Sequence, residues 1–305
     1  MPEVIVPARW KIYLPTIIFV IIISGLTAWY YLYGSTFFSL KGVPTVTFLG
    51  GFILVVVGIA AGLLGGLVGT GGCSIMLPVL YFWLGYPATV AIGTTLFAVL
   101  FTATSGGYGH IIHKNVDLRS TLWLAGIGVV GVLFGSWLFT KISSDTALFG
   151  LILGLAFILP TMRMLWEGIV KRRTSSQGNT IPGSRLSKGA FGAAIGVLTG
   201  VVGLGGGYAL VPGLIYLFGA PVYVTMGTSL ATMIPLAAVG SGIKIVQGFV
   251  DLGTAFLLGL GAIVGAQIGA SVIKKFKPST LKLIFGIYFL YVSLKFIFAY
   301  FGILV

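Results

Sequence analysis

Two glycine-rich stretches contain the residues whose types and spacing best suit binding chemistry. They span residues 66–78 and 200–212, and both lie inside long apolar sequence. Each glycine lowers helix stability by about 1 kcal/mol relative to alanine, so each stretch predicts a break in a membrane helix. Backbone N–H groups at such a break, with the positive end of the helix that follows, favour an anion. Because the stretch occurs twice, we expect one anion site built from two halves.

Close helix packing is the alternative explanation, because small residues let membrane helices approach each other. However, four glycines fall within positions 203–207 and a proline follows five positions later, and residues 69–78 resemble this pattern. Such clusters favour backbone that lines a cavity, as in the broken helices of transporters. The loop residues expected to line the substrate are Gly69, Thr70, Gly71, Gly72, Cys73, Ser74, Gly203, Gly205, Gly206, Gly207 and Tyr208.

Adjacent hydroxyl residues follow each glycine stretch by roughly 20 positions, each time directly after a further glycine. Helical hydroxyls often bond back to the carbonyl four residues earlier, which is one interpretation. Beside an open backbone they would instead donate to the oxygens of an oxyanion. On this second interpretation the ligands are Thr94, Thr95, Thr228 and Ser229.

Four ionisable basic side chains lie within or near apolar segments: His110, Arg163, Lys244 and Lys295. Near a helix end such a side chain usually reaches out to the interface, which is the simple explanation for His110 and Arg163. Lys295 has apolar sequence on both sides, so its charge is a candidate for attracting the anion. We treat all four as candidates for charge compensation or gating.

The five acidic residues are informative because of where they lie. Glu3, Asp117, Asp145, Glu167 and Asp251 fall in loops, at helix ends or in the N-terminal tail. The sequence thus predicts no mid-membrane carboxylate, which argues against a cation transporter and weakens a carboxylate-based proton relay. Asp117 and Asp251 each precede an apolar helix and are predicted to be N-caps.

Catalytic chemistry finds no support in the sequence. With histidines only at positions 110 and 113, one cysteine and no acid beside them, neither a zinc site nor a nucleophilic triad is indicated. We therefore expect no catalytic residue, no metal and no cofactor, and we do not expect an enzyme.

The composition is that of a membrane protein. The 305 residues are 57% hydrophobic and 8% charged, whereas globular domains are about 25% charged. An all-α polytopic protein in the lipid bilayer follows, beginning with a retained helix at 12–33. Most of the Lys and Arg side chains behind the net charge of +13 fall in short loops, which indicates positive-inside topology and no nucleic-acid partner.

An internal duplication organises the chain. A shift of 134 positions pairs Gly69 with Gly203 and Thr94 with Thr228, and it needs no gap over residues 62–142. Internal repeats of this kind are typical of secondary transporters. Each copy reads as five apolar segments, at 46–68, 73–85, 88–112, 119–141 and 146–166, then at 188–203, 207–219, 222–247, 252–273 and 279–303.

The topology follows from the loop charges. We place the N-terminus in the cytoplasm of a cell (inner) membrane and the C-terminus outside. An odd number of segments per copy makes the repeats inverted, so their glycine breaks should meet near the midplane. The short second segment either crosses fully or forms a re-entrant hairpin with the first. The predicted domains are 1–45 (tail and extra helix), 46–166 (first repeat), 167–187 (cytoplasmic connector) and 188–305 (second repeat).

These residues resemble the TauE/SafE family of membrane permeases. The resemblance rests on the duplicated Gly-x-Gly-Gly loops with Gly-Thr-Thr at 93–95 and Gly-Thr-Ser at 227–229, and it covers residues 46–303. It implies sulfite, organosulfonates or other small sulfur-containing anions as substrates. Cys73 departs from Gly207, its counterpart in the second copy; it either tunes the site or serves as another small residue.

The interpretation that combines these features is an alternating-access secondary transporter for an organosulfonate, such as sulfoacetate, or for sulfite. A passive anion channel, a sulfide or thiosulfate permease, and a membrane scaffold or receptor remain as alternatives. The sequence is compatible with an oligomer as well as with a monomer, and it does not determine the direction of transport.

Overall fold

The computed structural model describes residues 9–34, 40, 42–142, 178–203 and 205–275, and scattered residues of 151–166 and 283–301. Within these residues every regular element is a helix, and six helices are long and apolar enough to cross a membrane. The prediction of an all-α polytopic membrane protein is therefore confirmed. The domain boundaries, the inverted orientation of the two repeats and the side of the membrane on which each terminus lies stay predictions.

The described helices follow the predicted segments to within three residues at each end. They are α1 (Arg9–Leu32), α2 (Phe48–Val68), α3 (Cys73–Pro78) with the π-helical turn η2 (Val79–Trp83), α4 (Ala88–Ile112), α5 (Leu118–Ile142), α7 (Arg185–Val202), α8 (Gly207–Tyr216), α9 (Val222–Val246), α10 (Leu252–Val272) and the short η3 (Ile273–Lys275). The predicted fifth segment of each copy lies largely outside the described residues.

Local sequence explains where several helices begin. The Thr47 side chain accepts a hydrogen bond from the Gly50 N–H at the start of α2, and Ser184 does the same for α7. Hydroxyl caps of this kind supply partners that the first turn of a helix lacks. Pro87 and Pro221 stand at the N-caps of α4 and α9, where a missing N–H has no cost.

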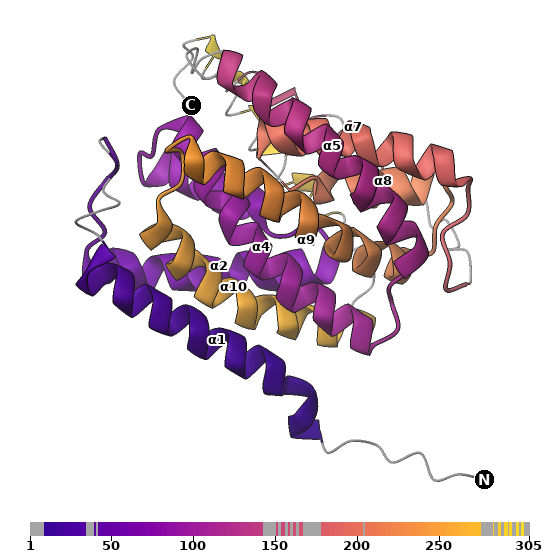
Figure 1. Ribbon diagram of the computed structural model, residues 1–305, viewed down its shortest axis with the longest axis horizontal. Helices are drawn as coiled ribbons and strands as arrows, with labels where there is room; N and C mark the ends of the chain where they lie inside the picture. Colours follow the sequence, from indigo (N-terminus) through magenta and orange to yellow (C-terminus); the bar gives the residue numbers. More distant parts are fainter. Residues whose placement is uncertain are drawn as a thin grey trace.

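The two copies of the repeat are interleaved in space. Helix α10, from the second copy, packs against α2 and α4 of the first, while α5 of the first copy packs against α7 and α9 of the second. The two three-helix groups meet along α4 and α9 (Figure 1). Gly106 on α4 lies against Leu230 on α9 and Gly240 on α9 lies against Leu96 on α4, so these two helices run antiparallel.

Glycines allow the closest helix contacts. A Cβ added to Gly62 on α2 would overlap the Ala262 carbonyl of α10, and one added to Gly196 on α7 would overlap the Gly128 carbonyl of α5. These two contacts correspond under the shift of 134. The same applies to further glycines in these four helices: Gly58, Gly66, Gly131, Gly135, Gly192, Gly200, Gly261, Gly265 and Gly269. Close packing of small residues, the alternative explanation for the glycines, therefore applies to those within these helices. The binding role was predicted for the glycine loops that follow α2 and α7.

The chain reverses direction after α2. A Cβ on Gly72 would overlap the Ala61 carbonyl, and one on Gly65 would lie 2.5 Å from the Gly72 nitrogen. The short α3 then contacts α2 and α4. The chain therefore turns back against α2 at the first glycine loop, and the second segment, α3 with η2, is shorter than the first.

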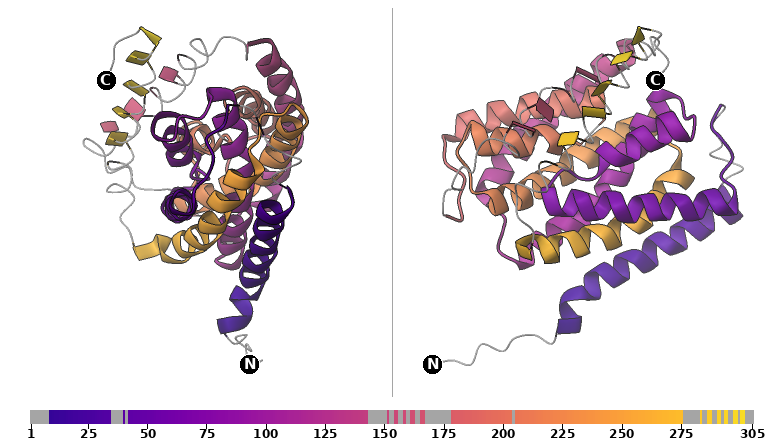
Figure 2. Two further views of the ribbon diagram at one scale, coloured as in Figure 1. Left: turned by 90° about the vertical axis from the view of Figure 1, so that its left-hand side faces the viewer. Right: turned by 180° about the vertical axis from the view of Figure 1, so that it is seen from behind.

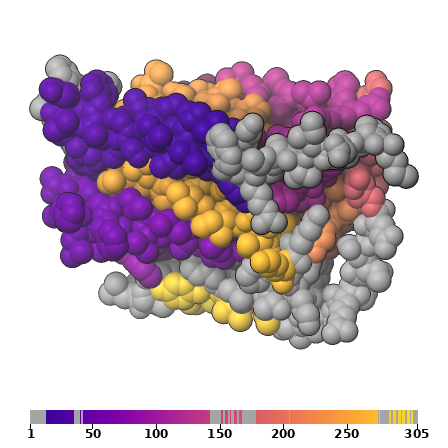
Figure 3. Space-filling model, turned by 90° about the horizontal axis from the view of Figure 1, so that it is seen from below, coloured from indigo at the N-terminus to yellow at the C-terminus, as the bar shows by residue number. Residues whose placement is uncertain are grey.

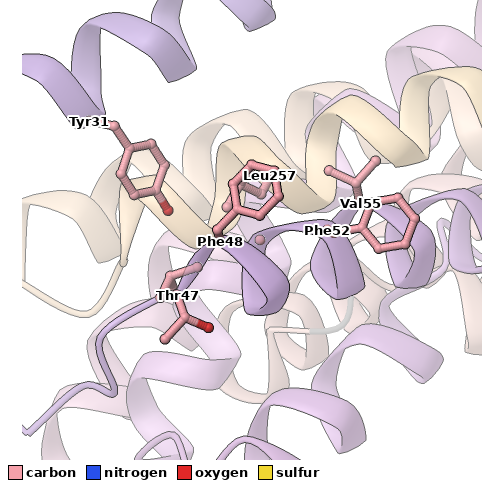
Figure 4. A pocket seen from close by; sticks show the side chains of 8 residues that line it. Tyr31, Thr47, Phe48, Phe52, Val55 and Leu257 are labelled. Atoms are coloured by element: carbon pink, nitrogen blue, oxygen red, sulfur yellow. The ribbon is translucent and has the colours of Figure 1, made fainter.

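Helix α1 lies on the outside of the bundle, along α10 (Figures 2 and 3). Phe19 and Tyr30 of α1 pack there against Phe101 and Phe256. An apolar cavity of about 400 Å³ separates the end of α1 from the start of α2, with Tyr31, Phe48 and Leu257 among its walls (Figure 4). Exposed apolar side chains along α1 are those expected of a helix in contact with lipid.

The helix contact at Gly62 generates a prediction. Gly62→Ala should destabilise the protein by about 1–3 kcal/mol, because α2 must move away from the Ala262 carbonyl. Gly126 on α5 has open space around it, so Gly126→Ala should stabilise the protein by up to about 1 kcal/mol through helix propensity. Unfolding of the detergent-solubilised proteins measures both, and equal effects would contradict the packing argument.

Candidate functional site

The two glycine loops share one backbone conformation. Gly69, Gly71 and Gly72 have φ values of +79°, +76° and +76°, and the second loop matches them with +69°, +66° and +79° at Gly203, Gly205 and Gly206. Glycine adopts this left-handed region without the steric cost that other residues meet. The predicted breaks are therefore confirmed in both copies, and the positive φ explains why each loop needs several glycines.

The structure brings these loops together at the junction of the two helix groups. A Cβ on Gly207 would lie 2.7 Å from the Thr70 Cα, so the start of α8 lies directly against the first loop. Gly69 also packs against Met226 of α9, and Gly203 packs against Ile92 of α4. Each loop thus lies against both the opposite copy and the opposite loop.

Two apolar side chains fill the junction between the loops. A Cβ on Gly205 would lie 2.6 Å from Met233 Cε and 2.8 Å from Val99 Cγ1, and Gly71 lies against the same two side chains. Val99 and Met233 are counterparts under the shift of 134. We did not single them out from the sequence, although each follows a predicted hydroxyl by one helical turn, which is a usable signal.

The loops are closed to the surroundings in this conformation. Thr70 is 4% exposed, Ser74 is 2% exposed and Tyr208 is 4% exposed. Four cavities lie around α1 and the start of α2, and none of these four is lined by a loop residue. A ligand could therefore reach the loops only after the helices or the side chains between them move.

The Cys73 thiol is fully buried and lies 3.7 Å from the Thr70 carbonyl oxygen within its own loop. At its counterpart Gly207, an added Cβ would lie 2.7 Å from the Met233 sulfur, so only glycine fits there. The difference between the two positions therefore reflects the space available on either side of the junction.

The first residue of each hydroxyl pair links the two copies. Thr94 Oγ1 accepts a hydrogen bond from the Asp251 N–H, and Thr228 Oγ1 accepts one from the Asp117 N–H, both at 2.9 Å. Both threonines are fully buried. Because each hydroxyl accepts in these bonds, its own hydrogen remains to be donated, and no acceptor for it lies among the described residues.

The second residue of each pair differs between the copies. Thr95 bonds back to the carbonyls of Ala91 and Ile92 on its own helix, which is the simpler of the two interpretations of a helical hydroxyl. Ser229 instead donates to the Gly69 carbonyl of the opposite loop at 2.8 Å. The Ser229 hydroxyl is therefore directed at a glycine loop, and the Thr95 hydroxyl is not.

The basic residues divide into two described and two undescribed. His110 Nε2 lies 2.8 Å from the Gly66 carbonyl oxygen, and Lys244 Nζ donates to the Gly200 carbonyl at 3.1 Å. Both side chains are fully buried, so the interpretation of His110 as a residue that reaches out to the interface is wrong. Arg163 and Lys295 lie outside the described residues. Among the described residues no three His, Cys, Asp or Glu side chains gather as a metal site would require.

Asp117 anchors the loop at one end of the molecule. Its carboxylate accepts hydrogen bonds from the N–H and hydroxyl of Ser120, which confirms the predicted N-cap of α5, and from the Ile181 N–H. Burial by itself raises the pKa of Asp117, but these hydrogen bonds and the Lys188 ammonium outweigh burial and hold the pKa below its usual value.

Asp251 occupies the corresponding place at the start of α10. It stands at the N-cap position, but its side chain makes no capping hydrogen bond, so this part of the prediction is wrong. The carboxylate instead accepts a hydrogen bond from the Tyr86 hydroxyl, which also lies 2.6 Å from Thr254 Oγ1. The tyrosine, which has no counterpart near Asp117, redirects the acid toward the first copy.

Comparison with known proteins bears on what this arrangement does. The family described as Sulfite exporter TauE/SafE matches residues 54–296, which is most of the chain. The chain belongs to the TauE/SafE family. The match includes both glycine loops and both hydroxyl pairs, so the resemblance drawn from those motifs is confirmed.

Individual relatives agree with this membership. The chain is 30% identical to the probable membrane transporter protein YdhB of Bacillus subtilis over 72% of its own length and 88% of YdhB. It is 29% identical to YunE of the same organism, also named a probable membrane transporter protein, over 81% and 97% of the two chains. It is 29% identical to Sulfite exporter TauE/SafE family protein 3 of Arabidopsis thaliana, over 51% and 32%.

No solved structure matches the chain. Membership of the TauE/SafE family and the apolar helices together make the protein a multi-pass membrane transporter of this type. A small anionic substrate and a surrounding lipid bilayer follow from the family. The names of the relatives are those of transporters, which agrees with the expectation that the protein is not an enzyme.

The Asp117 cluster generates a prediction for the TauE/SafE protein. Asp117→Asn should lower stability by about 1–3 kcal/mol, because an amide NH₂ cannot accept the bonds that the carboxylate accepts. Since the folded pKa is depressed, the stabilisation is present above the ordinary carboxyl value of about 3.9 and is lost as the pH falls through the folded value. The difference between the two proteins should therefore shrink in acid.

Thermal unfolding in detergent over a range of pH measures this effect. Asp251→Asn is the matched control. The Asp251 carboxylate accepts a 3.1 Å hydrogen bond from the Tyr86 hydroxyl and does not cap α10, so this substitution should lower the stability less. A pH-independent difference for Asp117→Asn would show that the carboxylate charge is not what stabilises the loop.

Proposed function

We propose that the protein is a secondary transporter for a small sulfur-containing oxyanion, an organosulfonate such as sulfoacetate, or sulfite. The observation that carries the proposal is the meeting of two glycine loops at the centre of a membrane-embedded bundle. In a bilayer, irregular backbone is tolerated where it is buried in protein or lines a cavity. The family description, which names sulfite export, supports a sulfur oxyanion as the substrate class.

The chemistry of the loops suits such an anion. A sulfonate stays ionised, presents three acceptor oxygens and is only weakly basic, so neutral N–H and O–H donors can hold it. Helix α8 begins directly at the second loop, and its positive end therefore points at the junction. The hydroxyl hydrogens of Thr94 and Thr228 lack acceptors among the described residues. Each threonine comes two residues after the residue that packs against a glycine loop, Ile92 against Gly203 and Met226 against Gly69.

Alternating access is the proposed mode of transport. The structure would correspond to an occluded state, with Val99 and Met233 as the seal between the loops. Because methionine is flexible, rotation of Met233 could admit the anion at small cost. We propose that the two repeats are inverted in the bilayer, with the N-terminus in the cytoplasm and the C-terminus outside, and that one group of helices rocks against the other. The antiparallel course of α4 and α9 supports this arrangement.

The first test is ligand-dependent thermal stabilisation of the purified protein. Sulfoacetate and sulfite should raise the unfolding temperature, whereas acetate should not. At a hundredfold excess of ligand over Kd, the free energy of unfolding should increase by about 2.7 kcal/mol. Sulfate, thiosulfate and taurine complete the panel. A shift confined to sulfonates would define the substrate class. Absence of any shift would contradict the proposal and favour a neutral substrate or a scaffold.

Flux in proteoliposomes then separates a transporter from a channel. Sulfoacetate loaded on one side should accelerate the uptake of labelled sulfoacetate from the other side, since a carrier returns faster when loaded. A passive channel would show flux without this counterflow, and a scaffold or receptor would show no flux.

A substitution in the second loop tests the binding site itself. Gly205→Leu should weaken sulfoacetate binding at least tenfold, because its side chain would fill the junction beside Val99 and Met233. Gly219→Leu is the matched control: Gly219 has nearly the same φ, +65° against +66°, but nothing lies within 4 Å of an added Cβ. Both variants therefore carry the backbone strain, and equal affinities would show that the loop is not the site.

A further inference from the structure

Two buried titratable side chains occupy equivalent places in the two copies. His110 in the last turn of α4 and Lys244 in the last turn of α9 are counterparts under the shift of 134. Each contacts a carbonyl near the end of the helix that leads into a glycine loop, at Gly66 in α2 and at Gly200 in α7. Each of these carbonyls lies three positions before the first glycine of the loop, Gly69 or Gly203.

Lys244 lies buried without a countercharge. Its Nζ donates to the Gly200 carbonyl and lies 2.9 Å from the centre of the Phe139 ring, and the described residues offer it no carboxylate. The helices packed on it, α7 with Gly200 and α5 with Phe139, carry no carboxylate, and the nearest titratable residue along α5 is Lys141, which is exposed. A buried ammonium with one hydrogen bond and one ring face has lost most of its hydration, so the charged form is disfavoured without an anion nearby.

His110 has a similar environment and a vacant position for a proton. A carbonyl oxygen can only accept, so Nε2 carries the hydrogen and Nδ1 is the free ring nitrogen in the neutral form. Nδ1 is buried and has no hydrogen-bond partner among the described residues. Of the helices around the ring, α2 and α10 carry no titratable residue and α9 carries Tyr223 and Lys244 at its two ends. His113 on the same helix is the titratable group whose charge acts on His110.

An anion bound between the loops would oppose this preference. Its negative charge would favour the protonated forms of Lys244 and His110, and protonation would in turn strengthen anion binding, since the two effects are one coupling free energy. The negative ends of α2 and α7, where the contacted carbonyls lie, also favour a cation. A proton would then enter with the anion and leave with it.

We infer that His110 and Lys244 are the proton-binding sites of an anion–proton symporter, one in each repeat, which take up protons from the loading side when the anion binds and release them on the other side. This inference rests on the proposed function, because it describes how the same carrier neutralises its anion. It needs no carboxylate relay, which agrees with the positions of Asp117 and Asp251 in the loops.

Proton uptake on anion binding is the measurement that tests the inference. Isothermal titration of the purified full-length protein with sulfoacetate, at neutral pH in buffers of different ionisation enthalpy, gives the number of protons taken up per anion. If thermal unfolding shows that thiosulfate, and not sulfoacetate, stabilises the protein, thiosulfate is the anion used in this titration. Wild-type protein should take up between one and about two protons per anion, since both sites gain a proton when the anion binds.

Four variants assign this uptake to residues. His110→Gln and Lys244→Gln keep an N–H donor but cannot titrate, so each should lower the uptake, and together they should bring it near zero. Lys244→Arg, whose charge is permanent, should still bind the anion while losing the proton uptake of this site. Lys141→Gln replaces an exposed lysine at the end of α5 and should change nothing.

The outcomes separate this inference from the proposed function. Anion binding without proton uptake in the wild type, or undiminished uptake in the double variant, would overturn the inference and leave the transporter proposal standing. Absence of anion binding by the wild type would overturn both. Binding by Lys244→Arg with reduced uptake would support the inference even if the Gln variants fail to fold.

Discussion

Close backbone contact between helices from different copies is the constraint on which the rest of the structure depends. Helix α2 approaches α10, and α7 approaches α5, until glycines of one helix lie against carbonyls of the other. In a bilayer there is little hydrophobic drive to bring helices together, so shape complementarity and dispersion must hold them. These contacts make the two copies interdependent, since each supplies a helix to the core of the other.

That interleaving positions the glycine loops. Each loop begins where a glycine-packed helix ends, so the ends of α2 and α7 are fixed by their partners α10 and α5. The hydroxyls of Thr94 and Thr228 attach α4 and α9 to two other loops, those that precede α10 and α5. Each of these hydrogen bonds joins a residue of one copy to a residue of the other. Contacts between the two helix groups reach the glycine loops directly, because Gly69 packs against Met226 of α9 and Gly203 packs against Ile92 of α4.

Charge in this protein is handled asymmetrically. Both described acids outside the tail, Asp117 and Asp251, lie in loops at helix starts, whereas His110 and Lys244 are buried beside the ends of α2 and α7. Among the described residues, the buried helix interior therefore carries groups that can become positive and no carboxylate. For a carrier of anions this is the useful sign, because a transient positive charge is compensated by the substrate and needs no permanent partner.

The sequence by itself determined the helices, their ends and the two breaks, because hydropathy, proline and glycine act locally and the duplication repeats each signal. It also identified Asp117 as an N-cap and placed both glycine loops in the candidate site. Only the tertiary structure decided which helices pair, because segments of equal apolarity carry no address in their sequence. It likewise revealed Val99 and Met233 between the loops, turned Asp251 toward Tyr86, and buried His110 and Lys244. Those outcomes depend on which side chains from distant segments meet, and no local pattern encodes that.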